Sequence, residues 1–261
     1  MIPQIIHYCW FGKGPIPQSH KKNIRNWKKK LPDFKFQLWN EKNFDVNICS
    51  YSREAYKAKK YAYVSDVARC YFLTQQGGIY LDTDVELIGD FNEYLNYHLF
   101  TAIETYKEFH QYSESYLDER YHLKNPASFV PYFGLLSSVL GTVRDNALLR
   151  DCLDYYLTWE LPASGFKGFA IDGLLANKAV KYGFQYRDVR QVLTGNMLIL
   201  ETGIFGYADA VNPNFEVLFH HNAGSWAELS GSKKRMVCLD KYGLLPFYLK
   251  IKSFKKKVLS S

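Results

Sequence analysis

An eight-residue stretch, Gly77–Asp84, most strongly limits how this chain can fold. Its sequence is Gly-Gly-Ile-Tyr-Leu-Asp-Thr-Asp. Glycines commonly end helices, and the apolar residues after them predict a short buried strand. Because side chains alternate along a strand, we expect Asp82 and Asp84 to point the same way at its carboxyl end. Two carboxylates at this place suit Mg²⁺ or Mn²⁺ beside a diphosphate.

An Asp-x-Asp pair by itself is a weak signal, because such pairs also occur in solvated turns. The buried strand before Asp82 makes the signal more specific, since open α/β sheets bind ligands at the carboxyl ends of their strands. We therefore favour a metal site over a solvated turn.

The amino-acid composition is that of an ordinary globular protein with an excess of positive charge. It has 261 residues, enough for one large domain, and a formal net charge of +7. This charge suits nucleotides, phosphates or an acidic membrane surface. The five cysteines have neither metal-ligand nor disulfide-framework spacing. We find no signal peptide and no apolar run that could span a bilayer, and we expect a cytoplasmic protein.

The order of the predicted elements indicates an α/β sheet. A strand at Ile5–Phe11, a basic helix at residues 18–30 and a strand at Phe34–Leu38 form a strand–helix–strand unit. Another helix is expected over residues 65–75. The other predicted elements are a helix-prone segment (41–63), an exposed insertion (104–128), an apolar segment expected to return to the sheet (130–140), helices (146–159 and 171–182) and strands (85–88, 99–103, 197–200 and 215–219).

Two charged residues fall on one face of the helix expected over residues 65–75. Asp66 and Arg69 stand three residues apart, and Ser65 or Asp66 is expected to cap the helix. The two charges either form an internal ion pair or contact a ligand, with Asp66 accepting from sugar hydroxyls and Arg69 meeting sugar or phosphate oxygens. Trp10, which ends the first strand, is either a core side chain or a platform for a nucleobase.

Two histidines, His220 and His221, follow the last predicted strand. An imidazole there would complete a metal shell supplied by two carboxylates, although a structural role is the alternative. Ser225 and Trp226 carry donors suited to a leaving phosphate. The Ala-Gly pair just before them lets the backbone approach that phosphate closely.

Four segments of the chain follow the order seen in one known family. They resemble the DXD-containing sugar transferases of glycosyltransferase family 32, which include bacterial capsular and lipooligosaccharide transferases and the yeast initiating α-mannosyltransferase. More distantly, they are similar to the catalytic domains of large clostridial glucosylating toxins. The resemblance covers roughly residues 2–90 and 215–227. The segments are Ile5–Gly12, Tyr63–Arg69, Gly77–Asp84 and His220–Trp226.

The resemblance implies a GT-A type fold, in which a Rossmann-like mixed sheet is flanked by helices, in a single domain with a variable helical insertion. It also implies a divalent metal, a nucleotide diphosphate sugar donor with UDP favoured, and retention of anomeric configuration. By the same resemblance, Trp10 would stack on the base, while Asp66 and Arg69 would hold the donor sugar.

The resemblance also assigns roles to the acidic pair and to the late motif. Asp82 would contact ribose, sugar or metal, and Asp84 would bind the metal. His221 matches the late metal ligand of related retaining enzymes, while Ser225 and Trp226 would hold the β-phosphate.

One segment departs from the family pattern. Family members often carry a Thr- or Gly-Pro segment where this chain has Gly168–Gly173. Within it, Asp172 either faces the acceptor or caps the helix that follows.

Together these features predict a metal-dependent retaining glycosyltransferase that moves a hexose from a nucleotide diphosphate sugar to a glycan or lipid-linked oligosaccharide in surface polysaccharide synthesis. The alternatives are glucosyl transfer to a protein, a non-catalytic nucleotide-sugar-binding module, and a metal-dependent phosphotransferase or nuclease. Nucleic acid ranks low as a partner, because no continuous basic stripe accompanies base-reading motifs.

The sequence also suggests a division into a catalytic domain at residues 1–243 and a basic aromatic tail at residues 244–261. The tail is either a contact with an anionic membrane surface or an ordinary solvated helix. In the first case, the protein would sit at the inner face of the cell membrane.

Overall fold

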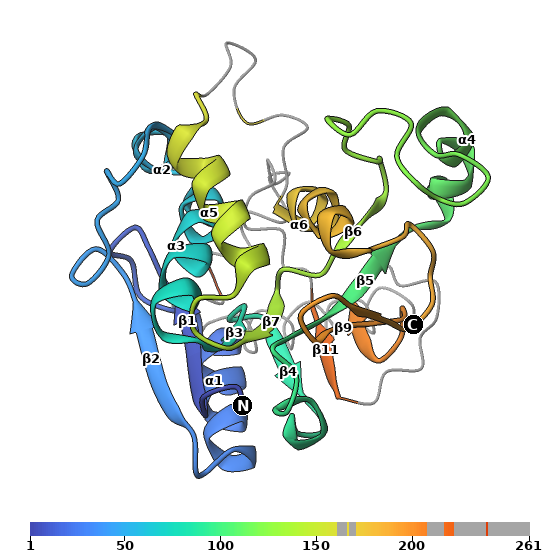
Figure 1. The fold of residues 1–261 in the computed structure, drawn as a ribbon. Helices are drawn as coiled ribbons and strands as arrows, with labels where there is room; N and C mark the ends of the chain where they lie inside the picture. The colour runs from blue at the N-terminus through green and yellow to red at the C-terminus, as the bar shows by residue number, and fades with distance from the viewer. Residues whose placement is uncertain (161–165, 167–170, 208–216, 222–238, 240–261) are drawn as a thin grey trace, which may run out of the picture.

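The computed structural model describes residues 1–160, 166, 171–207, 217–221 and 239. Within them, an eight-stranded mixed sheet carries helices on both faces (Figure 1). Its strands are β1 (Ile5–Cys9), β2 (Lys35–Trp39), β3 (Gly78–Leu81), β5 (Leu99–Thr105), β6 (Phe133–Leu135), β7 (Val139–Thr142), β8 (Gln191–Leu193) and β9 (Met197–Leu200). Their order is β2-β1-β3-β7-β5-β9-β8, and β6 pairs with β5 beside this path. The predicted mixed α/β sheet flanked by helices is confirmed.

The first unit of the sheet is the predicted strand–helix–strand crossover. Helix α1 (Gln18–Lys30) connects β1 to β2, and these two strands pair in parallel. Ile24 and Trp27 are the apolar residues that α1 buries, as the sequence pattern indicated. Strand β3 then pairs in parallel with β1, so the carboxyl ends of β1, β2 and β3 lie at one edge of the sheet.

A second, three-stranded sheet brings residues 218–220 next to the segment that carries Asp82 and Asp84. It consists of β4 (Val85–Leu87), β10 (Phe205–Tyr207) and β11 (Leu218–His220), in the order β10-β11-β4. Strand β11 runs antiparallel to β4, and His220 pairs with Val85. The end of β11 therefore lies beside the residue that follows Asp84.

The remaining helices pack mainly against the face of the large sheet opposite α1 (Figure 1). Along β3, Ile79 and Leu81 belong to the core that contains Trp27 of α1, whereas Tyr80 packs on the other side. The helices are α2 (Ser50–Lys57), α3 (Tyr61–Gln76), α4 (Ser113–Tyr116), α5 (Ala147–Thr158) and α6 (Ile171–Ala179), with 3₁₀ turns η1 (Asn92–Tyr94), η2 (Lys107–Gln111) and η3 (Val180–Tyr182).

Two local predictions are corrected. Helix α3 starts at Tyr61, so Ser65 does not cap it; the Ser65 hydroxyl instead donates to the Tyr61 carbonyl at 3.1 Å. The helix-prone segment 41–63 is interrupted, because α2 ends at Lys57 and Lys59 adopts a left-handed conformation with φ of 58°. Strands β8 and β10 are additional elements that the sequence pattern did not indicate. No helix in the described part of the chain is both long and apolar enough to cross a membrane.

Candidate active site

The Asp82–Asp84 segment is a turn at the end of β3. The strand stops at Leu81, and the amide of Val85, the first residue of β4, donates to the Asp82 carbonyl at 3.0 Å. Gly78, the first residue of the strand, is confined to glycine: its φ is 108°, and a Cβ there would lie 2.7 Å from His7 Nε2. Turn geometry, rather than the predicted strand alternation, thus places the two carboxylates.

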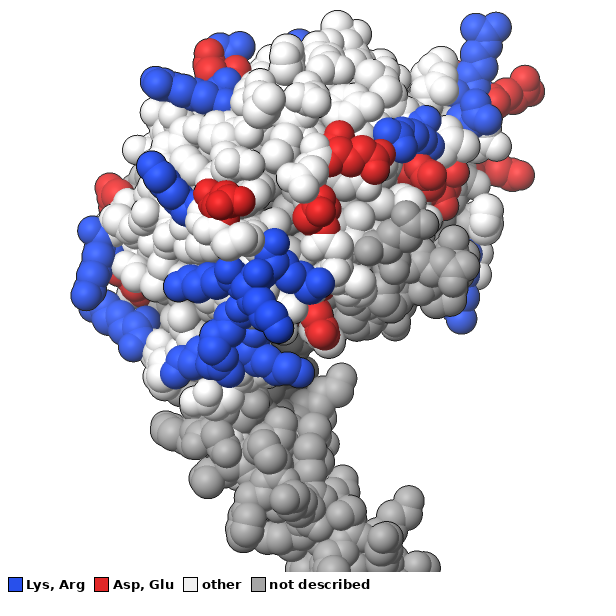
Figure 2. All heavy atoms as spheres, turned by 90° about the horizontal axis from the view of Figure 1, so that it is seen from below, with Lys and Arg blue, Asp and Glu red and all other residues white. Residues whose placement is uncertain are grey.

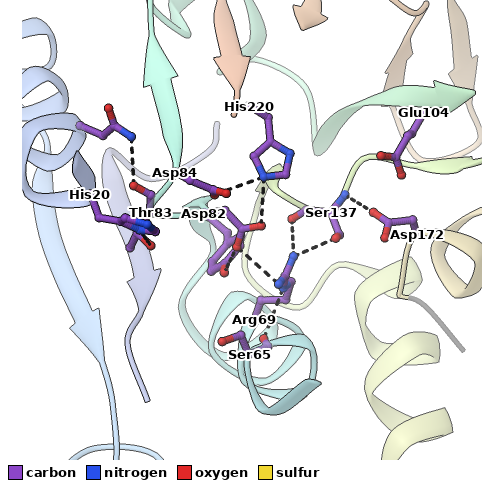
Figure 3. Close-up of polar contacts among 12 residues, drawn as sticks. His20, Ser65, Arg69, Asp82, Thr83, Asp84, Glu104, Ser137, Asp172 and His220 are labelled. Carbon is purple, nitrogen blue, oxygen red and sulfur yellow. Dashed lines mark hydrogen bonds and ion pairs between the residues drawn. The ribbon is translucent and has the colours of Figure 1, made fainter. Parts of the chain in front are cut away.

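His220 completes a three-residue cluster with these carboxylates. Its Nε2 lies 3.2 Å from Asp84 Oδ1 and 3.9 Å from Asp82 Oδ2. One ligand atom from each of the three residues lies within 4.8 Å of the others, an arrangement that could hold a metal ion. Figure 3 shows the imidazole directed between the two carboxylates.

The structure therefore places the side chain of His220, not that of His221, at the Asp82–Asp84 turn, called the acidic turn below. His221 points elsewhere, and its Nε2 lies 3.1 Å from Glu86 Oε2 at the surface. Consecutive side chains at a strand end point to opposite faces, so only one of the two histidines can reach the carboxylates.

The charge on His220 follows from its neighbours. Burial by itself lowers the pKa of this imidazole, but the hydrogen bond and charge of Asp84, then the charges of Asp82 and Glu104, raise it to about 9. Within the described residues its Nδ1 is buried without a hydrogen-bond partner. A divalent cation would replace the proton that these carboxylates hold on His220.

Arg69 of α3 lies against the same turn. Its Nη2 is 3.2 Å from Asp66 Oδ1 and 3.5 Å from Asp82 Oδ1, and its guanidinium sits 4.3 Å above the Tyr80 ring. The Tyr80 hydroxyl donates to Asp82. The predicted placement of Asp66 and Arg69 on one helix face is confirmed, and the side chains of both are almost completely buried.

The carboxyl group of Asp66 has a raised pKa. Burial raises its pKa to about 7, and the charges of Asp172 and Asp82 add to this rise, although Arg69 opposes it. Ion pairing and ligand contact, which the sequence left open as alternatives, are compatible here, since both residues also line a cavity.

Asp172 is linked to Arg69 through Ser137. Its Oδ1 accepts from the Ser137 amide at 2.8 Å, while Arg69 Nη1 donates to the Ser137 carbonyl and hydroxyl, each at 2.8 Å (Figure 3). Asp172 is the second residue of α6, so it lies inside the helix rather than before it. The position borders the cavity, as the acceptor-side hypothesis requires.

A cavity of about 650 Å³ opens beside this cluster. Polar residues (Asp66, Arg69, Asp82, Glu104, Ser137, Ser138, Asp172 and His220) gather on its walls with aromatic ones (Tyr63, Tyr106, Phe129, Tyr132, Phe133 and Phe166). A second hollow of about 690 Å³ lies between α5 and α6, but it contains none of the clustered residues. Convergent charged groups, rather than size, therefore identify the first cavity as the candidate site.

Glu104 and Tyr106 are site residues that the sequence reasoning missed. The Tyr106 hydroxyl donates to Glu104 Oε1 at 2.8 Å, and both side chains line the cavity. Burial, then the charge of Asp172, raises the pKa of Glu104 to about 8. Because side chains alternate along a strand, their spacing of two residues at the end of β5 could have indicated that both face the same side. In the sequence, both residues instead fall in the tyrosine-rich segment predicted as an exposed insertion.

Trp10 lies beside the acidic turn rather than in the cavity wall. Its Nε1 donates to the Gly14 carbonyl at 2.8 Å, and the edge of its ring meets His20 with ring centroids 5.5 Å apart. His20 Nδ1 in turn lies 2.7 Å from Thr83 Oγ1, in the middle of the turn. The predicted residues Ser225 and Trp226, and the tail at 244–261, lie outside the described residues.

Comparison with known proteins supports the interpretation of this region. Residues 17–101, which include α1, α3 and the acidic turn, match the family model described as "Glycosyltransferase sugar-binding region containing DXD motif". The match covers about a third of the chain, and it shows that this segment is similar to the DXD-containing glycosyltransferases. It is also similar to an uncharacterized glycosyltransferase, L373, of Acanthamoeba polyphaga mimivirus, with 38% identity over 100 residues. That match spans 35% of this chain and 40% of the length of the viral protein.

Two solved structures align with this chain at low similarity. PaToxG glycosyltransferase aligns with a TM-score of 0.45 and 17% identity over 69% of each chain. A glycosyltransferase involved in the glycosylation of the major capsid of PBCV-1 aligns with a TM-score of 0.42 and 12% identity, covering 84% of this chain and 94% of its own.

Proposed function

We propose that this protein is a metal-dependent glycosyltransferase that moves a hexose from a nucleotide diphosphate sugar, with UDP favoured, to a glycan or lipid-linked oligosaccharide. The observation that supports this most is the Asp82–Asp84–His220 cluster, whose Asp82 and His220 line a cavity together with the buried Asp66–Arg69 pair. A sugar-binding module would need the cavity, but it would not need three convergent metal ligands.

The donor set fits Mn²⁺ or Mg²⁺. Two carboxylates and one imidazole combine hard oxygen ligands with a borderline nitrogen, as Mn²⁺ accepts readily. Asp82, Asp84 and His220 would hold the ion, and His220 takes the role first assigned to His221. When bound, the ion would neutralise charge on the departing diphosphate.

The chain's own residues would position the donor around that ion. Arg69 is held by Ser137 with its guanidinium toward Asp82, where it would add a donor to the phosphate side. Asp66 would accept from hydroxyls of the donor sugar. Trp10 would supply the base platform, and Ser225 and Trp226 would bind the β-phosphate.

We favour retention by same-face displacement, in which the acceptor hydroxyl attacks from the side of the leaving group. A covalent intermediate needs an ionised, unencumbered nucleophile on the opposite side of the sugar. Glu104 accepts a hydrogen bond from Tyr106, and burial raises its pKa to about 8, which disfavours the ionised form that a nucleophile needs. Asp172 is occupied by the Ser137 amide, which leaves it suited to orienting the acceptor.

Release of nucleoside diphosphate from a panel of nucleotide sugars tests the proposal. Purified protein with Mn²⁺ should hydrolyse one donor slowly and transfer its sugar when an acceptor is added. Asp84→Asn should lose at least about a hundred-fold in turnover, in the range seen when one charge-stabilising group is removed. Glu86→Gln, two residues after the Asp82–Asp84 turn and paired with His221, is the matched control and should retain activity. Full activity in excess chelator or in the Asp84 variant would reject the metal-dependent reaction.

A further inference from the structure

Helix α1 carries a concentration of positive charge on its outer face. Its thirteen residues contain six basic side chains and no acidic one, so α1 alone accounts for +6 of the chain's formal net charge of +7. The six are Lys21, Lys22, Arg25, Lys28, Lys29 and Lys30. All except the half-buried Lys21 are exposed. Figure 2 shows lysine and arginine gathered into one patch on the face seen from below, where α1 lies.

Internal contacts do not account for these charges. Among the described residues, no ion pair joins an α1 side chain to a carboxylate. Lys28 Nζ lies over the Phe36 ring at 5.6 Å, and Lys30 Nζ donates to the Ile88 carbonyl. Keeping like charges this close on one helix costs stability unless an anionic partner neutralises them.

We propose that the basic face of α1 is a docking surface for an anionic phospholipid membrane. The charges are five lysines to one arginine, and lysine supplies mobile point charges rather than the planar fork preferred in nucleic-acid recognition. Trp27 of α1 is fully buried, so its indole is not available for base stacking. Ile88 beside Lys30 is 42% exposed, which adds an apolar side chain to the rim of the patch.

The opposite face of α1 contacts the turn that carries Asp82 and Asp84. His20 contacts the Thr83 hydroxyl, Asn23 Nδ2 donates to the Thr83 carbonyl at 3.2 Å, and Trp27 Nε1 donates to the Val85 carbonyl at 2.9 Å. A docked α1 would therefore hold the acidic turn about one helix diameter, roughly 10 Å, from the lipid surface. This consequence, unlike the docking itself, rests on the proposed function, and it suits an acceptor anchored in lipid.

Vesicle co-sedimentation of the full chain tests the docking surface. The wild type should sediment with phosphatidylcholine vesicles that contain phosphatidylglycerol and not with phosphatidylcholine alone. Joint substitution of Lys22→Glu, Arg25→Glu and Lys29→Glu should lower partitioning at least about tenfold, since each basic residue near an anionic surface contributes. The matched control, Lys107→Glu, Arg120→Glu and Lys124→Glu, makes the same change in charge on exposed residues away from α1.

The outcomes separate docking from catalysis. Equal partitioning of the two triple variants would overturn the proposal, and so would α1-dependent binding of duplex DNA or an acidic peptide without binding of vesicles. Thermal unfolding of both variants checks that they fold. Donor hydrolysis in solution should be unchanged in the α1 variant, so loss of vesicle binding with normal hydrolysis supports the surface. Vesicle binding by a protein that hydrolyses no nucleotide sugar would reject the proposed function alone.

Discussion

His220 Nε2 lies 3.2 Å from Asp84 Oδ1, although His220 ends the last described strand and Asp84 follows the third. The antiparallel pairing of β11 with β4 produces this contact, because it sets His220 opposite Val85. A register shift by one residue would bring the neighbouring histidine to the carboxylates instead. The pairing of two short strands thus decides which imidazole joins the cluster.

His220→Ala should weaken Mn²⁺ binding at least about tenfold, because it removes one of three protein ligands. His221→Ala is the matched control: its partner is Glu86 on the surface, and its metal affinity should stay within about twofold of wild type. Isothermal titration with Mn²⁺ measures both. The reverse order of the two affinities would contradict the assignment of His220.

The placement of Arg69 and Asp66 was accessible from the sequence, whereas the identity of the histidine was not. A spacing of three on a helix fixes a shared face locally. The choice between His220 and His221 depends instead on the register between β11 and β4, strands far apart in the chain, and no local pattern encodes it. Glu104 was obscured for a related reason: its strand extends to Thr105, two residues further than the apolar run indicated.

Arg69→Met should lower the free energy of unfolding by about 3 kcal/mol or more, because it leaves two carboxylates without their buried cation. The Arg69 and Asp66 side chains are only 4% and 10% exposed. Arg53→Met removes the same charge from an exposed pair with Glu54 and should cost far less, because solvent screens an exposed pair. Urea unfolding of both variants gives the comparison, and similar losses would show that Arg69 is not an internal brace.

The contact between His20 and Thr83 should help to hold the metal-binding turn in place. Thr83→Val keeps the shape of the side chain but removes the hydroxyl that lies 2.7 Å from His20 Nδ1. A lost hydrogen bond of about 1 kcal/mol corresponds to roughly a fivefold weaker affinity for Mn²⁺ if the turn is ordered mainly by this contact. Thr83→Ser retains the hydroxyl and should bind Mn²⁺ nearly as wild type does. Equal affinities of the valine and serine variants would show that the contact has no part in ordering the turn.

His7 should make stability depend on pH in the mildly acidic range. The Trp39 Nε1 donates to His7 Nδ1 at 3.0 Å, so the ring proton sits on Nε2, which lies 2.9 Å from the Gly77 carbonyl. Burial lowers the pKa of this imidazole to about 4, although the hydrogen bond to Gly77 opposes the shift. The neutral ring is thus the form that fits, because a second proton would meet the Trp39 N–H.

Between pH 6.5 and 4, His7 is protonated in the unfolded chain but neutral in the folded chain. The free energy of unfolding should therefore fall as pH drops from about 6.5 towards 4. The loss attributable to His7 is on the order of 3 kcal/mol, and it should level off below pH about 4, where the folded state is protonated as well. His7→Gln removes the ionisation, so the difference in unfolding free energy between wild type and variant should shrink steadily over this range. Urea denaturation at closely spaced pH values measures that difference, and a difference that stays constant from pH 7 to pH 4 would exclude His7 as the source.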